Sequence, residues 1–205
     1  MNGLIGIEGS SYVGKTTVAE KLLEMGFGIV PEYDTFGPFP VSDGSVQGLK
    51  GVVDELLDRE KRRSELVDPA RLNFEDRTPI SLITFEGVKG LHAESEERAR
   101  IHDEVRDYAL SRIVQLHESQ DIILPNKIAV LRLKDEKEFK RRVQKRGVTA
   151  VGELAIFATQ LFVAQDSLDH ARSLLGASSS AILDVDTKKP LEIAQGLIKF
   201  ASRAV

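Results

Sequence analysis

The chain carries the octapeptide Gly9-Ser10-Ser11-Tyr12-Val13-Gly14-Lys15-Thr16, which fits the phosphate-loop (Walker A) pattern G-x-x-x-x-G-K-[ST]. An apolar run at residues 4–7 precedes the loop and is typical of a buried strand, and residues 17–23 follow it with apolar side chains at helical spacing. Strand, glycine loop and helix therefore come in the order that rests a phosphate on a helix N-terminus. The alternative is a glycine-rich turn with a solvated lysine, and the flanking elements favour nucleotide binding over it.

Each residue type in the loop has a chemical reason. Gly9 and Gly14 let the chain curl so that successive backbone N–H groups point at anionic oxygens, a geometry that side chains would obstruct. Lys15, which we expect to be an exposed loop lysine, can then reach the β- and γ-phosphates, and the Thr16 hydroxyl can hold Mg²⁺. The predicted nucleotide contacts are Gly9, Ser10, Ser11, Tyr12, Val13, Gly14, Lys15, Thr16 and Thr17.

Length and composition limit the class of protein. The 205 residues, 41% of them hydrophobic, suit a single α/β domain over residues 1–205. With a net charge of −4, the protein has no overall positive field that would attract nucleic acid or an anionic membrane. A small phosphorylated ligand is therefore a better candidate than either. The absence of cysteine excludes disulfides, thiolate catalysis and cysteine-ligated zinc. No apolar run is long enough to span a bilayer and no leader precedes the first strand, which predicts a cytoplasmic protein and leaves a homodimer open.

Strands and helices alternate along the chain. Strands are expected at residues 4–7, 28–30, 72–74, 127–133 and 181–185. Helical periodicity covers residues 52–66, 96–117, 136–146, 154–175 and 191–201. Residues 34–51, rich in glycine, proline, serine and aspartate, predict a long loop near the site. The alternation predicts a P-loop NTPase-type fold of three layers, with a five-stranded, mostly parallel sheet flanked by helices.

Polar residues after the second and third strands are candidates for the site, because ligands of parallel sheets bind beyond the carboxyl ends of the strands. Glu32 could accept a hydroxyl proton or hold a substrate, and a solvated loop glutamate is the alternative. Asp76 could bind Mg²⁺ directly or through water, and Arg77 could clamp a phosphate with its planar fork. The alternative for these two residues is a local surface pair.

A basic helix at residues 136–146, capped by Asp135, predicts a short lid over approximately residues 136–153. Spacing of four places Arg142 and Arg146 on one face, where they could approach a transferring phosphoryl group, and puts Arg141 and Lys145 on another. Which arginine serves the lid stays open at this stage. The alternative is that these cations only offset the helix dipole, and the phosphate loop in the same small domain favours the lid.

Taken in order along the chain, these residues resemble the deoxynucleoside kinase and thymidylate kinase branch of the P-loop kinases. The similarity covers nearly the whole sequence. It rests on Ile7-Glu8-Gly9 leading into Gly14-Lys15-Thr16-Thr17, on Pro31-Glu32, on Asp76-Arg77-Thr78, on the lid Arg142-Val143-Gln144-Lys145-Arg146-Gly147, and on the ending Asp184-Val185-Asp186-Thr187 with Pro190. The resemblance implies that Glu32 is a general base toward a substrate hydroxyl and that Arg77 holds the phosphate-acceptor end. It also implies that the loop after the last strand borders the adenine.

The resemblance implies a kinase that uses ATP and Mg²⁺ to phosphorylate a small-molecule nucleoside or nucleoside monophosphate. The base, the sugar and the donor preference are not specified by the sequence, although Phe36, Phe39 and Phe85 could supply stacking surface. For Phe36 and Phe39 the commoner alternative is a loop anchor. Two other functions stay open: phosphorylation of another small hydroxyl compound such as a sugar, a nicotinamide riboside or an antibiotic, and nucleotide binding without catalysis.

Overall fold

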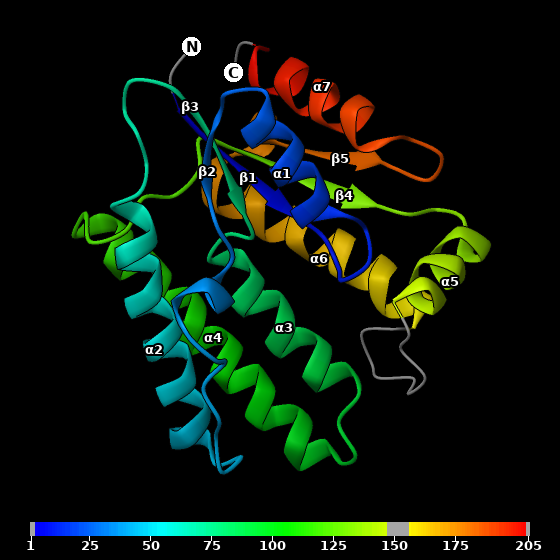
Figure 1. Ribbon diagram of the computed structural model, residues 1–205. Coiled ribbons are helices and arrows are strands. Elements are labelled where there is room, and N and C mark those ends of the chain that lie inside the picture. The colour runs from blue at the N-terminus through cyan, green and yellow to red at the C-terminus, as the bar shows by residue number, and fades with distance from the viewer. Residues whose placement is uncertain (1–2, 147–155, 204–205) are drawn as a thin grey trace.

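Five parallel strands form one sheet in the order β2-β3-β1-β4-β5 (Figure 1). The structure is a computed structural model that describes residues 3–146 and 156–203. The strands are β1 (Gly3–Glu8), β2 (Gly28–Val30), β3 (Leu72–Asp76), β4 (Lys127–Arg132) and β5 (Ser180–Asp184). The central strand, β1, pairs Ile5 with Phe74 of β3 and with Lys127 of β4. The predicted five-stranded parallel sheet is confirmed.

Helices cover both faces of the sheet. In Figure 1, α1 and α7 lie on one face, α6 crosses the other, and α3, α4 and α2 extend outward from the α6 side. The helices are α1 (Lys15–Glu24), α2 (Val46–Ser64), α3 (Ile80–Leu91), α4 (Glu96–Glu118), α5 (Glu136–Lys145), α6 (Phe157–Leu175) and α7 (Pro190–Ala201), with 3-10 turns at Tyr33–Phe36 and Ala177–Ser179. This is the predicted three-layer arrangement.

The strands are largely buried because helices lie on both faces of the sheet. In β4, the residues from Ile128 to Leu131 are fully buried, as expected for a strand with helices on both sides. A cluster between the sheet and helices α1 and α7 includes Ile7, Leu22 and Phe74, and a second cluster lies among α2, α3 and α4. The first cluster supports the strand ends from which the functional loops emerge.

Helix starts coincide with side chains that satisfy free backbone N–H groups. Ser45 accepts from the N–H of Gly48 at 3.0 Å at the start of α2. Asp135 accepts from the N–H of Lys137 at 2.8 Å, so the predicted cap of the basic helix is confirmed. Ser95 caps α4 in the same way.

The structure differs from the sequence-based expectation in three places. The loop predicted at residues 34–51 is shorter in the structure, because α2 already begins at Val46, where Ser45 caps it. Helix α3 was not predicted, since its sequence is mostly apolar and a short buried apolar run does not by itself distinguish a helix from a strand. Strand β3 continues to Asp76, so Glu75 and Asp76 belong to the strand itself.

Helix α5 forms the first part of the predicted lid. The rest of that prediction, residues 147–153, lies outside the described residues, as does Leu154, and α6 is described from Phe157 onward. Within residues 3–146 and 156–203, none of the helices has the length and apolar character needed to cross a membrane.

Two glycine substitutions should have opposite effects on stability. A Cβ at Gly6 would lie 2.3 Å from the Cγ2 atom of Thr78, whereas a Cβ at Gly196 in α7 would meet nothing within 4 Å. We expect Gly6→Ala to lower the free energy of unfolding by about 1–3 kcal/mol. Gly196→Ala should raise it by about 0.4–1 kcal/mol, because alanine restricts the unfolded chain. Urea unfolding of both variants measures the difference, and equal effects would contradict the packing described for Gly6.

Candidate functional site

The phosphate loop adopts the backbone geometry that its glycines predict. Gly9 and Gly14 have φ angles of 129° and 98°, and Tyr12 lies in the left-handed region at 72°. A Cβ at Gly9 would lie 2.4 Å from the carbonyl oxygen of Leu131, so the chain can pass this point only as glycine. The Tyr12 ring packs edge-on against Phe139 of α5, with ring centroids 6.1 Å apart. The loop is therefore held by β4 and by α5.

Lys15 is buried, and the expectation of an exposed loop lysine is wrong. Only 5% of its surface is exposed, and Nζ donates to the carbonyl oxygens of Gly9 and Ser10, both at 2.9 Å. Burial, followed by the nearby positive charge of Arg77, lowers the pKa of Lys15 to about 7, although Asp76 acts in the opposite direction. The loop thus wraps around its own lysine.

Glu32 and Arg77 meet beside the loop. They come from the ends of β2 and β3, and Nε of Arg77 donates to Oε1 of Glu32. Arg77 has a φ angle of 65°, which is unusual for a non-glycine residue, and its guanidinium carbon lies 4.8 Å above the ring centroid of Phe85. The structure therefore joins two predicted site residues that are 45 positions apart in the sequence.

Asp76 and Thr16 fit a hard cation. Asp76 is 3% exposed, and its Oδ1 atom is buried without a hydrogen-bond partner. Burial raises the pKa of the Asp76 carboxyl, while Lys15 and a hydrogen bond with Thr16 lower it. An orphaned carboxylate oxygen beside a hydroxyl group matches the oxygen ligands that Mg²⁺ takes, with phosphate oxygens and water as further ligands.

Glu8 has a structural role that the sequence analysis missed. Its carboxylate accepts from the N–H of Thr78 at 2.7 Å, from the Thr78 hydroxyl at 2.6 Å and from the Ser81 hydroxyl at 2.8 Å. These bonds tie the last residue of β1 to the first turn of α3. The signal was present in the sequence as a carboxylate that ends a buried strand.

A cavity of about 620 Å³ lies on one side of the phosphate loop. Its walls come from the loop and the start of α1, from α5, and from residues 186–190 after β5. The lining includes Tyr12, Val13, Gly14, Thr17, Arg142, Arg146, Asp186, Thr187 and Pro190. The ending that the resemblance places beside an adenine therefore faces the same cavity as the loop and the basic helix.

The two lid arginines face this first cavity in different ways. Arg142 donates to the carbonyl oxygens of Val13 at 2.9 Å and Val185 at 3.1 Å, and its Nε contacts Glu138 at 2.7 Å. The guanidinium carbon of Arg146 lies 5.6 Å from the ring centroid of Tyr12. Arg142 therefore connects the phosphate loop to the loop after β5. Its approach to a phosphoryl group stays a prediction.

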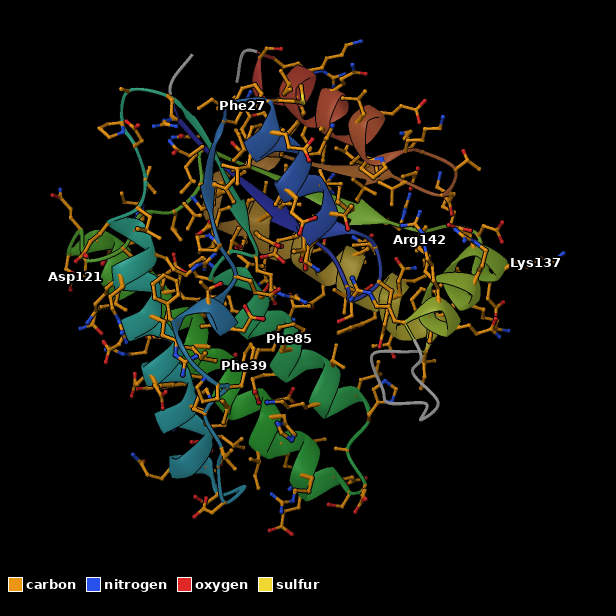
Figure 2. The ribbon with its side chains drawn as sticks, in the orientation of Figure 1. Phe27, Phe39, Phe85, Asp121, Lys137 and Arg142 are labelled. Carbon is orange, nitrogen blue, oxygen red and sulfur yellow. The ribbon has the colours of Figure 1, made fainter. Side chains whose placement is uncertain are left out.

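A second cavity, of about 390 Å³, is lined by Ser11 of the loop. Two of its other lining residues, Phe39 and Phe85, are labelled in Figure 2, where they lie apart from Arg142 of the first cavity. The lining of the second cavity combines Glu32 and Arg77 with the aromatic side chains of Phe39 and Phe85, and includes Ser11, Val88 and Lys89. Phe36 does not belong to this lining among the residues described. Val88 and Lys89 lie on α3 together with Phe85, and no motif in the sequence distinguished them. Both cavities include residues of the phosphate loop, whereas the buried residues Lys15 and Asp76, together with Thr16, belong to neither lining.

Solved structures share this fold. The thymidylate kinase from Candida albicans matches with a TM-score of 0.66 and 18% identity, covering 97% of this chain and 90% of its own. The deoxyadenosine kinase from M. mycoides with bound dCTP gives a TM-score of 0.58 at 16% identity, covering 98% and 100%. No protein-family model and no curated sequence matches the chain.

A third similar structure is that of the NadR protein in complex with NAD and AMP-PNP. Its TM-score is 0.57 at 11% identity, and the match covers all of this chain and 51% of that protein, so the chain spans about half of NadR. These similarities define the chain as having the P-loop kinase fold. They confirm the predicted fold class and the resemblance to thymidylate and deoxynucleoside kinases in three dimensions.

Replacing Lys15 should show how its burial makes the free energy of unfolding depend on pH. The unfolded chain binds a proton at Lys15 up to about pH 10, while the folded chain loses it near pH 7. Between these values the stability of the wild type therefore rises with pH. The difference in the free energy of unfolding between the wild type and Lys15→Met should therefore change in favour of the wild type by up to about 1.4 kcal/mol per pH unit above pH 7. Urea unfolding at pH 6 to 9 without nucleotide measures this, and a constant difference would contradict the lowered pKa.

Proposed function

We propose that the protein is an ATP-dependent kinase that phosphorylates a hydroxyl group of a nucleoside. The observation that carries the proposal is the contact between Glu32 and Arg77 in a cavity beside the phosphate loop. A carboxylate in that place can accept the proton of a hydroxyl group, and the guanidinium can stabilise charge on the phosphoryl group. The fold similarity to deoxyadenosine kinase supports a nucleoside acceptor, while the similarity to thymidylate kinase keeps a nucleoside monophosphate as the alternative.

The first cavity is the proposed donor site. Backbone N–H groups of residues 9–17 would bind the phosphates of ATP, and Lys15 would contact the β- and γ-phosphates. Thr16 and Asp76 would hold Mg²⁺, which neutralises charge on the phosphates when it is bound. Residues 186–190 would border the adenine, because they line the same cavity as the loop.

The second cavity is the proposed acceptor site. As the hydroxyl oxygen attacks the γ-phosphorus, its proton passes to Glu32 and the bond to the ADP oxygen breaks. The phenyl rings of Phe39 and Phe85 offer apolar surface for a base. Lys89 lies 2.5 Å from Glu86, so both cations in the lining have a carboxylate partner.

This charge balance favours a nucleoside over a nucleoside monophosphate. A phosphate on the acceptor would have to compete with Glu32 for Arg77 and would bring added negative charge against the Glu32 carboxylate. A neutral hydroxyl compound avoids both costs. Arg142 and Arg146 would act from the donor side, where Arg142 fixes the loops and Arg146 has to leave the Tyr12 ring to reach a phosphoryl group.

A panel of acceptors with ATP and Mg²⁺ tests the proposal. The panel contains ribonucleosides, deoxynucleosides, their monophosphates and nicotinamide riboside, and the measurement is ADP release with a control that lacks acceptor. We expect release that depends on a nucleoside. Release with monophosphates would move the acceptor to the nucleotide class, and release with the nicotinamide riboside would favour the other hydroxyl compounds. ATP binding by calorimetry with no turnover on any acceptor would indicate a nucleotide-binding module.

Glu32→Gln should remove the proposed base and keep the shape of the side chain. We expect kcat to fall by roughly 10²–10⁴-fold with unchanged affinity for ATP. Glu118→Gln, at an exposed position at the end of α4, is the matched control and should leave kcat unchanged. A normal kcat in Glu32→Gln would exclude this residue as the base.

Asp76→Asn should weaken the proposed metal site. Because an amide is a poorer ligand for Mg²⁺ than a carboxylate, the Mg²⁺ concentration for half-maximal rate should rise about tenfold or more. Asp121→Asn, on the exposed turn after α4, serves as the control. Identical metal dependence of the wild type and Asp76→Asn would remove Asp76 from the metal site.

A further inference from the structure

Arg63 lies in the last turn of α2 and is completely buried. Its Nε atom donates to the carbonyl oxygen of Pro31 at 2.8 Å. Its Nη2 atom donates to the carbonyl oxygens of Asp76 at 3.1 Å and Arg77 at 2.6 Å. One guanidinium therefore holds the backbone at the ends of both β2 and β3.

These contacts are next to the residues proposed to act on the acceptor. Pro31 directly precedes Glu32, and Arg77 has the unusual positive φ angle. A non-glycine residue keeps such a conformation only where its surroundings enforce it. The hydrogen bond from Arg63 to the Arg77 carbonyl is a direct constraint of that kind.

Arg59, one turn earlier on the same face of α2, makes a parallel set of contacts. Its Nη1 atom donates to the carbonyl oxygens of Tyr33 at 3.3 Å and Gly37 at 2.8 Å, and its Nη2 atom donates to that of Pro38 at 2.7 Å. Together with the Pro31 contact, these bonds hold the carbonyl groups on both sides of Glu32. The 37–38 segment leads directly to Phe39 in the acceptor cavity.

We propose that Arg59 and Arg63 are positioning residues of the acceptor site, which α2 presents as a pair. Arg63 sets the relative placement of Glu32 and Arg77 by holding the ends of β2 and β3. Arg59 sets the segment that carries Phe39 against the cavity. The proposal rests on the proposed function, because it assigns these contacts to the catalysis of phosphoryl transfer to the acceptor.

The carboxylates around Arg63 suggest an alternative, in which the arginine only neutralises buried charge. Glu60 accepts from Arg63 and from the Tyr33 hydroxyl at 2.7 Å, and Glu75 lies 3.4 Å from Arg63. Burial and then the charge of Glu60 raise the pKa of Glu75 well above its usual range. A positive charge alone would satisfy these groups, and lysine could supply it. The arginine, however, donates from two separate atoms, Nε to the carbonyl at the end of β2 and Nη2 to those at the end of β3, and a lysine has only one donor atom.

The test therefore uses Arg63→Lys, which keeps the charge and loses the fork. Because small displacements of reacting groups are costly, kcat should fall roughly 10- to 100-fold while the KM for ATP stays near the wild-type value. Arg59→Lys should mainly raise the KM for the nucleoside. Val53→Ala, a buried apolar change on α2, is the matched control that lowers the melting temperature without changing kcat.

A double-variant comparison separates positioning from general destabilisation. If Arg63 acts through Glu32, then Arg63→Lys should have little further effect on kcat in a Glu32→Gln background. Effects that multiply independently, or a lowered melting temperature with normal kcat, would overturn the proposal. Should Arg63→Lys not fold, Arg59→Lys gives the second measurement, and an unchanged KM for the nucleoside there would also count against it.

Hydrogen–deuterium exchange supplies a readout that does not depend on activity. In Arg63→Lys, peptides covering residues 32–36 and 76–81 should exchange faster than in the wild type, while those from α1 and β5 should not change. If the wild type phosphorylates no acceptor, the proposed function fails, and this exchange pattern still decides whether α2 orders the two strand ends. Unchanged exchange in both segments would show that it does not.

Discussion

Eight ionisable side chains are buried at the carboxyl edge of the sheet, and the structure of that edge follows from the need to satisfy them. Four are carboxyl groups and four are basic: Glu8, Glu60, Glu75, Asp76, Lys15, Arg59, Arg63 and Arg77. A buried charge without a partner is strongly destabilising, so most of these groups are paired within the fold. The exceptions are one carboxylate oxygen each of Glu60, Glu75 and Asp76, which have no hydrogen-bond partner. Several of them find backbone carbonyl or N–H groups of the loops after the strands, which fixes these loops before any ligand arrives. Fixed dipoles of this kind are what a site that stabilises developing charge requires.

On each side of the phosphate loop, an arginine from a helix donates hydrogen bonds to backbone carbonyl groups of two loops. On one side, Arg142 in the last turn of α5 donates to carbonyl groups of the phosphate loop and of the loop after β5. On the other side, Arg63 in the last turn of α2 donates to carbonyl groups after β2 and β3. In both cases a peripheral helix connects two strand ends through one guanidinium. The central strand and its loop are therefore flanked by two connections of similar chemistry, one for each cavity.

Much of this fold is readable from the sequence, because glycine positions, apolar strands and helix caps are local signals. The phosphate loop, the five strands and the cap at Asp135 were all predicted in this way. Helix α3 was not, because a short and mostly apolar run does not by itself distinguish a buried helix from a strand. In the site, Glu32 and Arg77 were each predicted because they follow a strand, whereas their contact depends on the strand order, which places β2 beside β3. The carboxylate of Glu8 at the end of a buried strand was visible in the sequence, but its partners, like those of Arg63, lie far away in the chain and could not be read from it.

The burial of Lys15 has a consequence for energetics in solution. Its amine has a pKa of about 7 in the ligand-free loop, so above that pH a large share of the molecules hold it uncharged. A phosphate anion entering the loop would favour the charged form and raise that pKa. Association with a nucleotide would then take up a proton from the solvent. The measured heat of association would vary with the ionisation enthalpy of the buffer, and the affinity would decrease toward alkaline pH even though the nucleotide's own charge stays constant.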